Sequence, residues 1–336
     1  MYPRARPARR RLAAAILCAG FLGMLACAPG EVQAQAPDYP TRPVKIIVPF
    51  AAGGPADAYG RFIAQRLQES MGANFIVENR PGAGSIIGTD AVAKAAPDGY
   101  TLLVMSNTHT VNESLIPNKP FALMRDFAAI SPINYSDLVL VARKELPVKD
   151  LPELLRQAKS KPDGMTYASS GPGTPYHMAG ELFKAMAGVS IIHVPYKGSS
   201  GARTDVLGGQ VDMMFDAITT MVPHINSGRV MALGTTGEKR SAVLPDVPTI
   251  AERGVPGYEA TIWLGVMAPK DVPAAILDRL NAEIRRIVAD PKVGQAWAAQ
   301  GASPLSMDRP EFNRYLEQDI EKWAHIVRVS GAKAGQ

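Results

Sequence analysis

Residues 44–71 read VKIIVPFAAGGPADAYGRFIAQRLQESM, and this stretch decides the fold. Four of its first five residues are apolar and aliphatic, which predicts a strand over 44–48. Its later part carries large apolar side chains at four-residue spacing, which is typical of one helical face; these are Tyr59, Ile63, Leu67 and Met71. A strand that leads through a glycine-containing loop into a helix is the opening unit of an α/β sheet.

The same alternation continues along the chain. A strand over 74–78, a helix over 85–96 and a strand over 101–105 complete a β-α-β-α-β series, which favours a mainly parallel sheet with helices on both faces. A second series follows, with a helix over 151–160 and strands over 165–168, 191–194, 211–215 and 230–234.

Two long apolar strands, over 137–142 and 261–268, stand before and after the second series. They are what a chain needs to pass into a second lobe and return. We therefore predict one lobe of residues 35–140 with 263–336, a second lobe of residues 141–262, and hinge strands near 137–143 and 260–268. From Pro273 onward the pattern is helical, with apolar faces that we expect to pack on the first lobe; they are Ile276, Leu280, Ile284 and Ile287, then Phe312, Leu316, Ile320 and Trp323.

The first 34 residues differ from the rest. Five arginines precede an apolar run over 12–28, and small or apolar residues lead to Ala34, which together predict a secretory signal peptide cleaved near Ala34. The run is shorter than the ~20 residues that span a bilayer. A twin-arginine signal at Arg9-Arg10 and a lipoprotein site at Cys27 are the alternatives. The predicted location is the periplasm.

Cleavage near Ala34 changes the charge and the cysteine content. The whole chain has 36 Lys+Arg, 31 Asp+Glu and two cysteines, whereas the mature chain keeps 31 Lys+Arg, 30 Asp+Glu and neither Cys18 nor Cys27. A net charge of +1 argues against nucleic-acid binding through bulk charge. A chain without cysteine has no disulfide, no thiol nucleophile and no Cys-based zinc site.

The loop over 49–57 is a candidate anion site. Glycines let a backbone approach a ligand closely, proline is tolerated at a first helical position, and the N–H groups of a first turn favour negative charge. The candidate binding residues here are Phe50, Ala51, Gly53, Gly54 and Asp57. A tight turn that only enters a helix is the alternative reading.

A second loop of the same kind spans 167–177. Thr174 is a natural N-cap and Pro175 a natural first helical residue, while two serines bring hydroxyls beside backbone N–H groups. The candidates in this loop are Ser169, Ser170, Gly171, Gly173, Thr174 and His177. Two such loops, one in each lobe, favour an anion bound between the lobes.

Other polar residues follow strands at the same predicted edge. Ser106, Asn107 and Thr108 come after the strand ending at Met105, where open α/β sheets bind ligands, although a solvated loop would look similar. Lys197 offers a cation that suits a carboxylate, and Asp216 ends another strand.

Enzyme and metal signatures are largely missing. The sequence has no GxxxxGK[ST] loop, no GxSxG elbow and no HExxH, and residues 82–88 do not match the spacing of a dinucleotide fingerprint. Five histidines form no ligand cluster by spacing. We therefore expect no catalysis, no metal and no cofactor. An exported enzyme that acts on a carboxylate, with His177 or His109 as general base, stays open as an alternative.

Several ordered phrases, at matching spacing over residues 38–330, resemble the substrate-binding proteins of tripartite tricarboxylate transporters, also called Bug proteins. They are RPV…PF with Gly53, Gly54 and Asp57 (42–57), ENRPGAG (78–84), APDGYTLL (96–103), YASSG (167–171), HVPYKG (193–198) and LPDVPT (244–249). The resemblance implies a type II, Venus-flytrap periplasmic binding protein with two α/β lobes.

It also implies a function. Such a protein closes on a small mono-, di- or tricarboxylate, held largely by backbone amides, hydroxyls and water, and delivers it to membrane permease subunits. The matching segments here are 50–57 and 169–174. Because Asp57 would repel a carboxylate, we expect it to orient backbone or water. A ligand sensor for a membrane receptor is an alternative role, and a monomer is expected.

This chain departs from the family pattern at two places. Ala51-Ala52 and Ala56 stand where many relatives have Pro-Pro and a hydroxyl residue, which removes one family contact to the carboxylate. Pro175-Tyr176 replaces small polar residues, so Tyr176 either presents an apolar face to a longer or aromatic acid or packs on the lobe surface.

Overall fold

Strand β4 (Phe127–Arg143) connects two sheets. The computed structural model describes residues 38–334, and residues from Asp38 onward form one compact unit. Residues 127–137 of β4 pair antiparallel with β9 (Thr261–Pro269), and residues 138–143 pair antiparallel with β7 (Met213–Ala217) and β8 (Val230–Thr235). The predicted signal peptide, with Cys18 and Cys27, lies outside the described residues. No helix within residues 38–334 combines the length and apolar character needed to cross a membrane.

The first sheet contains the opening series of strands. β1 (Val44–Val48) pairs in parallel with β2 (Phe75–Asn79) and β3 (Thr101–Ser106), and β9 pairs antiparallel with β3. β10 (Ala302–Pro304) is antiparallel to β4. The predicted strand over 137–142 begins ten residues earlier than expected. Pro132 and the polar residues near it interrupt the apolar alternation that would indicate a strand. In the structure, the pairing register between β4 and β9 shifts on either side of Pro132, and the strand continues through it.

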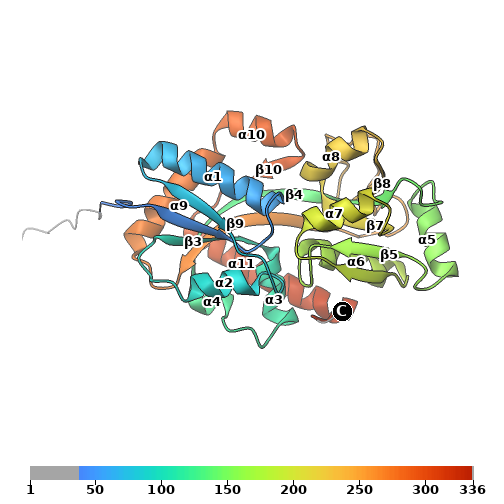
Figure 1. Cartoon of the computed structure of the whole chain (residues 1–336), viewed down its shortest axis with the longest axis horizontal. Helices are drawn as coiled ribbons and strands as arrows, with labels where there is room; N and C mark the ends of the chain where they lie inside the picture. Colours follow the sequence, from blue (N-terminus) through green and yellow to red (C-terminus); the bar gives the residue numbers. More distant parts are fainter. Residues whose placement is uncertain (1–37, 335–336) are drawn as a thin grey trace, which may run out of the picture. The chain divides into compact units, whose positions relative to one another are not determined.

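The second sheet repeats the arrangement. β5 (Thr166–Ser169) pairs in parallel with β6 (Ile192–Pro195) and β7, and β4 and β8 add antiparallel pairs. The strands joined by helices are therefore parallel, as predicted, whereas the crossing strands make each sheet mixed. The strand order across both sheets is β2-β1-β3-β9-β4-β7-β5-β6 (Figure 1).

Helices cover both sheets (Figure 1). Those that accompany the first sheet are α1 (Pro55–Met71), α2 (Ile86–Ala93), α3 (Asn107–Leu115), α4 (Leu123–Asp126), α9 (Ala274–Val288), α10 (Pro291–Ala298) and α11 (Arg309–Ser330). Those of the second sheet are α5 (Leu151–Ser160), α6 (Pro175–Ala187), α7 (Ser199–Leu207) and α8 (Ile218–Asn226).

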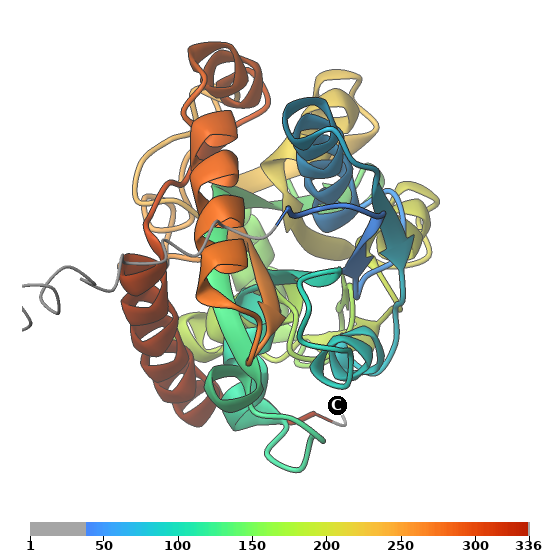
Figure 2. The ribbon, with the colours of Figure 1, turned by 90° about the vertical axis from the view of Figure 1, so that its left-hand side faces the viewer.

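Side chains on the two faces of β1 belong to two different layers of the first hydrophobic core. Ile46 packs in a cluster with Ile63 of α1 and Leu280 of α9, whereas the next residue, Ile47, packs in a cluster with Phe312 of α11. Successive strand side chains point to opposite faces of a sheet. Figure 2 shows α1 and α9 on one side of this sheet, and α2 and α11 on the other.

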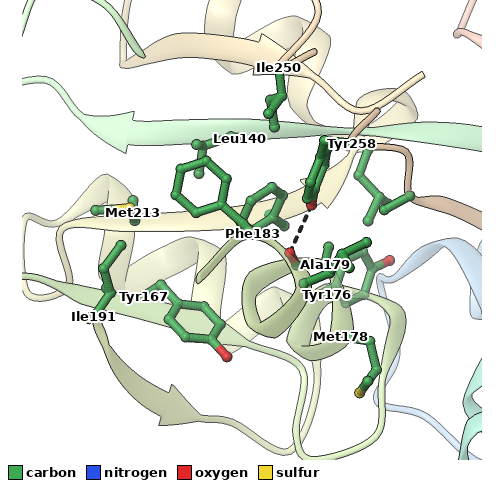
Figure 3. Close-up of a cluster of buried hydrophobic side chains, with 14 of the residues drawn as sticks. Leu140, Tyr167, Tyr176, Met178, Ala179, Phe183, Ile191, Met213, Ile250 and Tyr258 are labelled. Atoms are coloured by element: carbon green, nitrogen blue, oxygen red, sulfur yellow. Dashed lines mark hydrogen bonds between the residues drawn. The ribbon is translucent and has the colours of Figure 1, made fainter. Parts of the chain in front are cut away.

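The second core is rich in aromatic side chains (Figure 3). Phe183 of α6 contacts the rings of Phe215 and Tyr258, and the buried Tyr258 hydroxyl donates to the carbonyl oxygen of Ala179 at 2.8 Å. The hydroxyl thus has the partner that a buried phenol needs. This core makes the second lobe a platform for the loops at the end of β5 and β6.

Helix α11 extends farther than expected. Phe312 and Leu316 belong to the first core, as predicted, but Trp323 and the following Ile326 lie in the core of the second sheet. The prediction that this face packs on the first lobe alone is therefore wrong for Trp323. The cause is length, since 22 residues at 1.5 Å each span about 33 Å.

Candidate functional site

A small central cavity lies where the carboxyl ends of strands from both sheets meet. Its volume is ≈ 30 Å³, which holds about two water molecules. The first sheet supplies Phe50, Ala51, Gly54, Pro55, Ala56, Ser106, Ile262 and Leu264, and the second supplies Ser170, Pro175, Tyr176, Gly198 and Ser199. This is the edge of an α/β sheet at which ligands bind.

The N-terminus of α1 opens onto the cavity without a side-chain cap. Gly54 is the N-cap and has no side chain, and Pro55 follows in the first turn. The Asp57 carboxylate accepts hydrogen bonds from the Gly53 backbone N–H at 3.0 Å and from Arg61 Nε at 2.9 Å. Asp57 therefore orients the loop backbone, and the first-turn N–H groups beyond Pro55 keep no intrahelical partner.

A second uncapped helix start, that of α7, faces the same cavity. Its N-cap is Gly198, which forms no side-chain cap, and Gly198 and Ser199 both line the cavity. Sequence reasoning missed this helix start. The signal was the run Gly198-Ser199-Ser200, but Gly201 in the first turn weakens the helical pattern.

The N-terminus of α6, in contrast, carries a side-chain cap, Thr174. The Thr174 hydroxyl donates to the Gly171 carbonyl at 2.7 Å and accepts from the His177 N–H at 3.4 Å. The Gly173 N–H donates to His177 Nδ1 at 3.2 Å. These predicted site residues hold the loop together and do not line the cavity, whereas the neighbouring Ser170 does.

Two serines of this loop have different surroundings. Ser169 Oγ shares a hydrogen bond with His193 Nε2 at 2.7 Å and accepts from the Gly171 N–H at 3.1 Å. Ser170 is 9% exposed, and its Oγ is buried without a hydrogen-bond partner. A buried hydroxyl without a partner costs about 1–3 kcal/mol.

The segment after β3 is the start of a buried helix. Ser106 lines the cavity, and its hydroxyl donates to Thr108 Oγ1 at 3.0 Å. Asn107 Nδ2 donates to the Thr261 carbonyl at 2.9 Å, which ties α3 to the crossing strand β9. Of the three predicted residues, only Ser106 reaches the cavity. The alternative, a solvated loop, is wrong because all three are buried.

The two histidines considered as bases are buried and neutral. Burial lowers the pKa of His177 to about 3 and that of His109 to about 4. His109 Nε2 is hydrogen-bonded to Thr89 Oγ1 at 3.0 Å, and the Ser106 N–H donates to His109 Nδ1 at 3.2 Å. Neither histidine lines the cavity.

Two charged residues predicted to bind the ligand, Asp216 and Lys197, do not line the central cavity. Asp216 is fully buried, and its Oδ2 lies 2.8 Å from Arg203 Nε, so the carboxylate is neutralised inside the second lobe. Burial raises the pKa of Asp216, while Arg203 acts to lower it. Lys197 is exposed and lines a second pocket beside the central cavity. Among residues 38–334, no cluster of three or more His, Asp or Glu could hold a metal ion.

Other cavity residues were not predicted as binding residues. Ile262 and Leu264 are alternate residues of β9 and share one face of that strand, which makes part of the wall apolar. Tyr176 is buried and is one of the residues that line the cavity. Pro55, Ala56 and Pro175 complete the two helix starts.

Residues 60–332 match the family described as tripartite tricarboxylate transporter family receptor. The chain belongs to this family. It is 39% identical to the protein BugT of Bordetella pertussis over 301 residues, which cover 89% of this chain and 92% of BugT. It is also 39% identical to a protein encoded between tcbD and tcbE in Pseudomonas sp. strain P51, over 95% of this chain and 94% of that protein.

Solved structures show the same two-lobed binding-protein fold. The structure of an R. palustris protein with adipate superposes with a TM-score of 0.85 at 33% identity, over 88% of this chain and 99% of that one. The periplasmic binding protein BugD gives 0.83 at 35% identity, over 88% and 99%. MatC of Rhodopseudomonas palustris, with bound malate, gives 0.80 at 32% identity, over 86% and 100%. Members of this family are solute-binding receptors of transporters.

Proposed function

We propose that this protein captures a small carboxylate in the central cavity and delivers it to the membrane permease of a tripartite tricarboxylate-type transporter. The observation that carries the proposal is the meeting of two uncapped helix starts, at Gly54 and Gly198, on one cavity. First-turn N–H groups and the positive end of each helix dipole favour an anion. The relatives solved with adipate and malate support the same class of ligand.

The acidic residue closest in sequence to this cavity does not oppose an anion. Asp57 is paired with Arg61 and with the Gly53 N–H, so its charge is directed at its own loop. Ser170 and Ser106 are the serines that the two loops contribute to the cavity wall. Preformed donors in a site away from bulk water bind an ion more strongly than exposed donors do. Net charge plays little part in this arrangement.

The two lobes meet around the cavity. The Ser200 hydroxyl donates to the Ala52 carbonyl at 2.9 Å, and a Cβ added at Gly198 would lie 2.6 Å from the Ala51 Cβ. We infer that the chain crosses between lobes near 137–143 and 260–268, and that bending there opens the cavity for ligand exchange. A bound acid would contact both helix starts and so favour the closed arrangement.

We further propose that the protein performs no chemistry on its ligand and acts as a monomer in the periplasm. The buried, neutral His109 and His177 lie away from the cavity, which removes the proposed general bases. Export through the predicted signal peptide would be tested by sequencing the N-terminus of the mature protein, with cleavage near Ala34 expected. Uptake measurements in a deletion strain would separate transport from sensing.

A thermal-shift screen tests the ligand class. C4–C6 dicarboxylates, citrate, acidic amino acids and aromatic acids are compared with neutral sugars. A ligand at a hundredfold excess over its dissociation constant stabilises the folded protein by about 2.7 kcal/mol. A rise in melting temperature with one or more acids is expected. A rise with a sugar and with no acid would contradict the proposal.

A further inference from the structure

The two crossing strands part at one point, and Thr236 lies between them there. The ladder between β4 and β9 ends at the pair Asp137 and Thr261, and from Leu138 onward β4 pairs with β7 and β8 instead. The next residues on the two strands, Leu138 and Ala260, are not paired with each other in this ladder. Both of them bond to Thr236, which directly follows β8.

Thr236 forms four hydrogen bonds that hold these strands. Its hydroxyl accepts from the Leu138 N–H at 2.8 Å and donates to the Ala260 carbonyl oxygen. Its backbone N–H donates to the Leu138 carbonyl at 3.0 Å, and its backbone carbonyl accepts from the Ala260 N–H at 3.1 Å. Each crossing strand is therefore tied, through one donor and one acceptor, to a single residue of the second lobe.

These hydrogen bonds lie away from water. Thr236 and Leu138 are 0% exposed, and Ala260 is 2% exposed. A buried donor or acceptor that loses its partner is costly, because water does not replace the bond. A movement of the lobes that pulled the strands away from Thr236 would leave several such groups unpaired. We therefore expect the strands to bend on either side of Thr236 while these bonds stay formed.

The crossing strands have open space on the face away from the central cavity. Ile262 and Leu264 line the central cavity, whereas Thr261 lines a pocket of ≈ 480 Å³. Because successive side chains of a strand point to opposite faces, the two spaces lie on opposite sides of β9. We call the larger space the outer pocket. Its walls include residues 237–242 of the second lobe and residues 301–303 of the first.

This arrangement permits rotation about the crossing strands. A rotation that separates the lobes at the central cavity brings the same lobes closer at the outer pocket, and the outer pocket has the volume to accommodate that movement. Thr236 lies between the crossing strands, and the next residue, Gly237, lines the outer pocket. The residue that ties the two strands is thus at the axis of such a rotation.

We infer that Thr236 is the pivot of lobe closure. Its hydroxyl positions Leu138 and Ala260, and through them it sets the angle between the two lobes. The inference rests on the proposed capture of a ligand by closure of the lobes, and it specifies which residue governs that movement. Thr236 lines neither the central cavity nor the outer pocket, so it is a positioning residue that acts through the strands.

Distances between two spin labels, measured by pulsed electron paramagnetic resonance, test the inference without a ligand. The protein produced from residue 35 onward has no cysteine, so introduced cysteines are labelled selectively. Gln68→Cys in α1 and Lys159→Cys in α5 place one label on each lobe, both at exposed positions. The width of the distance distribution then reports the range of angles between the lobes.

Three variants separate the pivot from a general loss of stability. Thr236→Val removes the hydroxyl, Thr236→Ser keeps it, and Thr89→Val is the matched control, because Thr89 is also 0% exposed and its hydroxyl donates to the Ser85 carbonyl at 2.8 Å. Thr236→Val should broaden the distance distribution by about twofold, since the strands lose their shared partner. Thr236→Ser and Thr89→Val should reproduce the distribution of the parent protein, although Thr89→Val should also lose stability in urea denaturation.

Amide hydrogen exchange gives a second test that needs no variant. If the bonds stay formed in every arrangement of the lobes, the Leu138 and Ala260 N–H groups should exchange as slowly as the slowest amides elsewhere in β4. Exchange of both amides about a hundredfold or more faster than that would show that the bonds break when the lobes move, and would overturn the pivot.

A distance distribution for Thr236→Val that equals that of the parent protein, or a broadening of equal size for Thr89→Val, would also overturn the pivot. Neither measurement uses a ligand. The thermal-shift screen with acids decides carboxylate capture separately, so the capture can fail while the pivot stands, and the pivot can fail while the capture stands.

Discussion

The Ser200 hydroxyl of α7 donates to the Ala52 carbonyl oxygen, at 2.9 Å, across the boundary between the two lobes. The bond joins the start of one helix to the loop before another, and both helix starts lack side-chain caps. The same contact that closes the lobes therefore also brings the two sets of free N–H donors onto one cavity. In the proposed function, closure and anion binding are therefore linked through these residues.

Gly198→Ala should weaken binding without unfolding the protein. Gly198 has φ 168°, an extended conformation open to any residue, but its new Cβ would meet the Ala51 Cβ at 2.6 Å. The clash exists only when the lobes are together. We expect the dissociation constant of the bound acid to rise about tenfold or more, with the free energy of unfolding of the unliganded protein within about 0.5 kcal/mol of wild type. Calorimetric titration and urea denaturation measure the two quantities. Unchanged affinity would mean that closure does not need this contact.

Ser170→Ala should separate stability from affinity. The buried Ser170 hydroxyl has no partner, so its removal should leave the unliganded protein equally stable or up to about 2 kcal/mol more stable. Ligand affinity should fall about tenfold, because a donor to the anion is lost. Thermal melts with and without acid report both effects. A variant that is less stable without ligand and binds normally would assign Ser170 to folding alone.

Arg203→Met should destabilise the fold. It leaves the fully buried Asp216 carboxylate without the guanidinium 2.8 Å away, and an unpaired buried charge costs about 3–5 kcal/mol. Lys94→Met is the matched control, since Lys94 pairs with Asp90 at an exposed position. The control should change the free energy of unfolding by no more than about 0.5 kcal/mol. Equal losses for the two variants, in urea denaturation at neutral pH, would contradict the assignment of Asp216 to the core.

Asp319→Asn should change how stability depends on pH. Burial raises the pKa of Asp319 from 3.8 to about 6, although its carboxylate accepts from Thr110 Oγ1 at 2.5 Å and from Trp263 Nε1 at 3.2 Å. The folded protein therefore holds a proton on Asp319 at pH values where the unfolded chain has lost it. That contribution to stability is full below pH about 4 and is lost as the pH rises through about 6.

Asp319→Asn removes the pH-dependent loss of stability that Asp319 causes. The free energy of unfolding of the variant minus that of wild type should therefore increase by about 1–3 kcal/mol between pH 4 and pH 7. The buried histidines act in the opposite direction. The lowered pKa values of His109 and His177 give stability that is present above pH 6.5 and is lost as the pH falls toward about 4 and about 3. The variant keeps both histidines, so its own stability should rise with pH. Urea denaturation at both pH values tests this, and a constant difference between the variant and wild type would contradict it.

Periodicity predicted much of the fold because burial imposes it. The helix after β1 and the strands of both sheets follow from apolar spacing, as Ile46 and Ile47 on opposite faces of β1 illustrate. The first half of β4 could not be predicted, because Pro132 interrupts its pattern and only pairing with β9 makes it a strand. The packing of Trp323 in the second core depends on where α11 points, which no local pattern reports.

The site was predicted in part. The loop over 50–57 and the backbone-orienting role of Asp57 followed from glycine, proline and charge, and the structure places Asp57 on the Gly53 N–H. The second helix start was assigned to α6, whose His177 N–H donates to the Thr174 cap, whereas α7 supplies the uncapped start. Thr174 was predicted as an N-cap, whereas the start of α7 at Gly198 was not predicted, because Gly201 in the first turn weakens the helical pattern.

A crystal structure of the complex with the acid that gives the largest thermal shift tests the central claim most directly. A carboxylate is expected in the central cavity, within hydrogen-bond distance of first-turn N–H groups of α1 and α7 and of Ser170 Oγ. A ligand whose carboxylates all lie away from both helix starts, with the cavity near Gly54 and Gly198 filled by an apolar or uncharged group, would contradict the account.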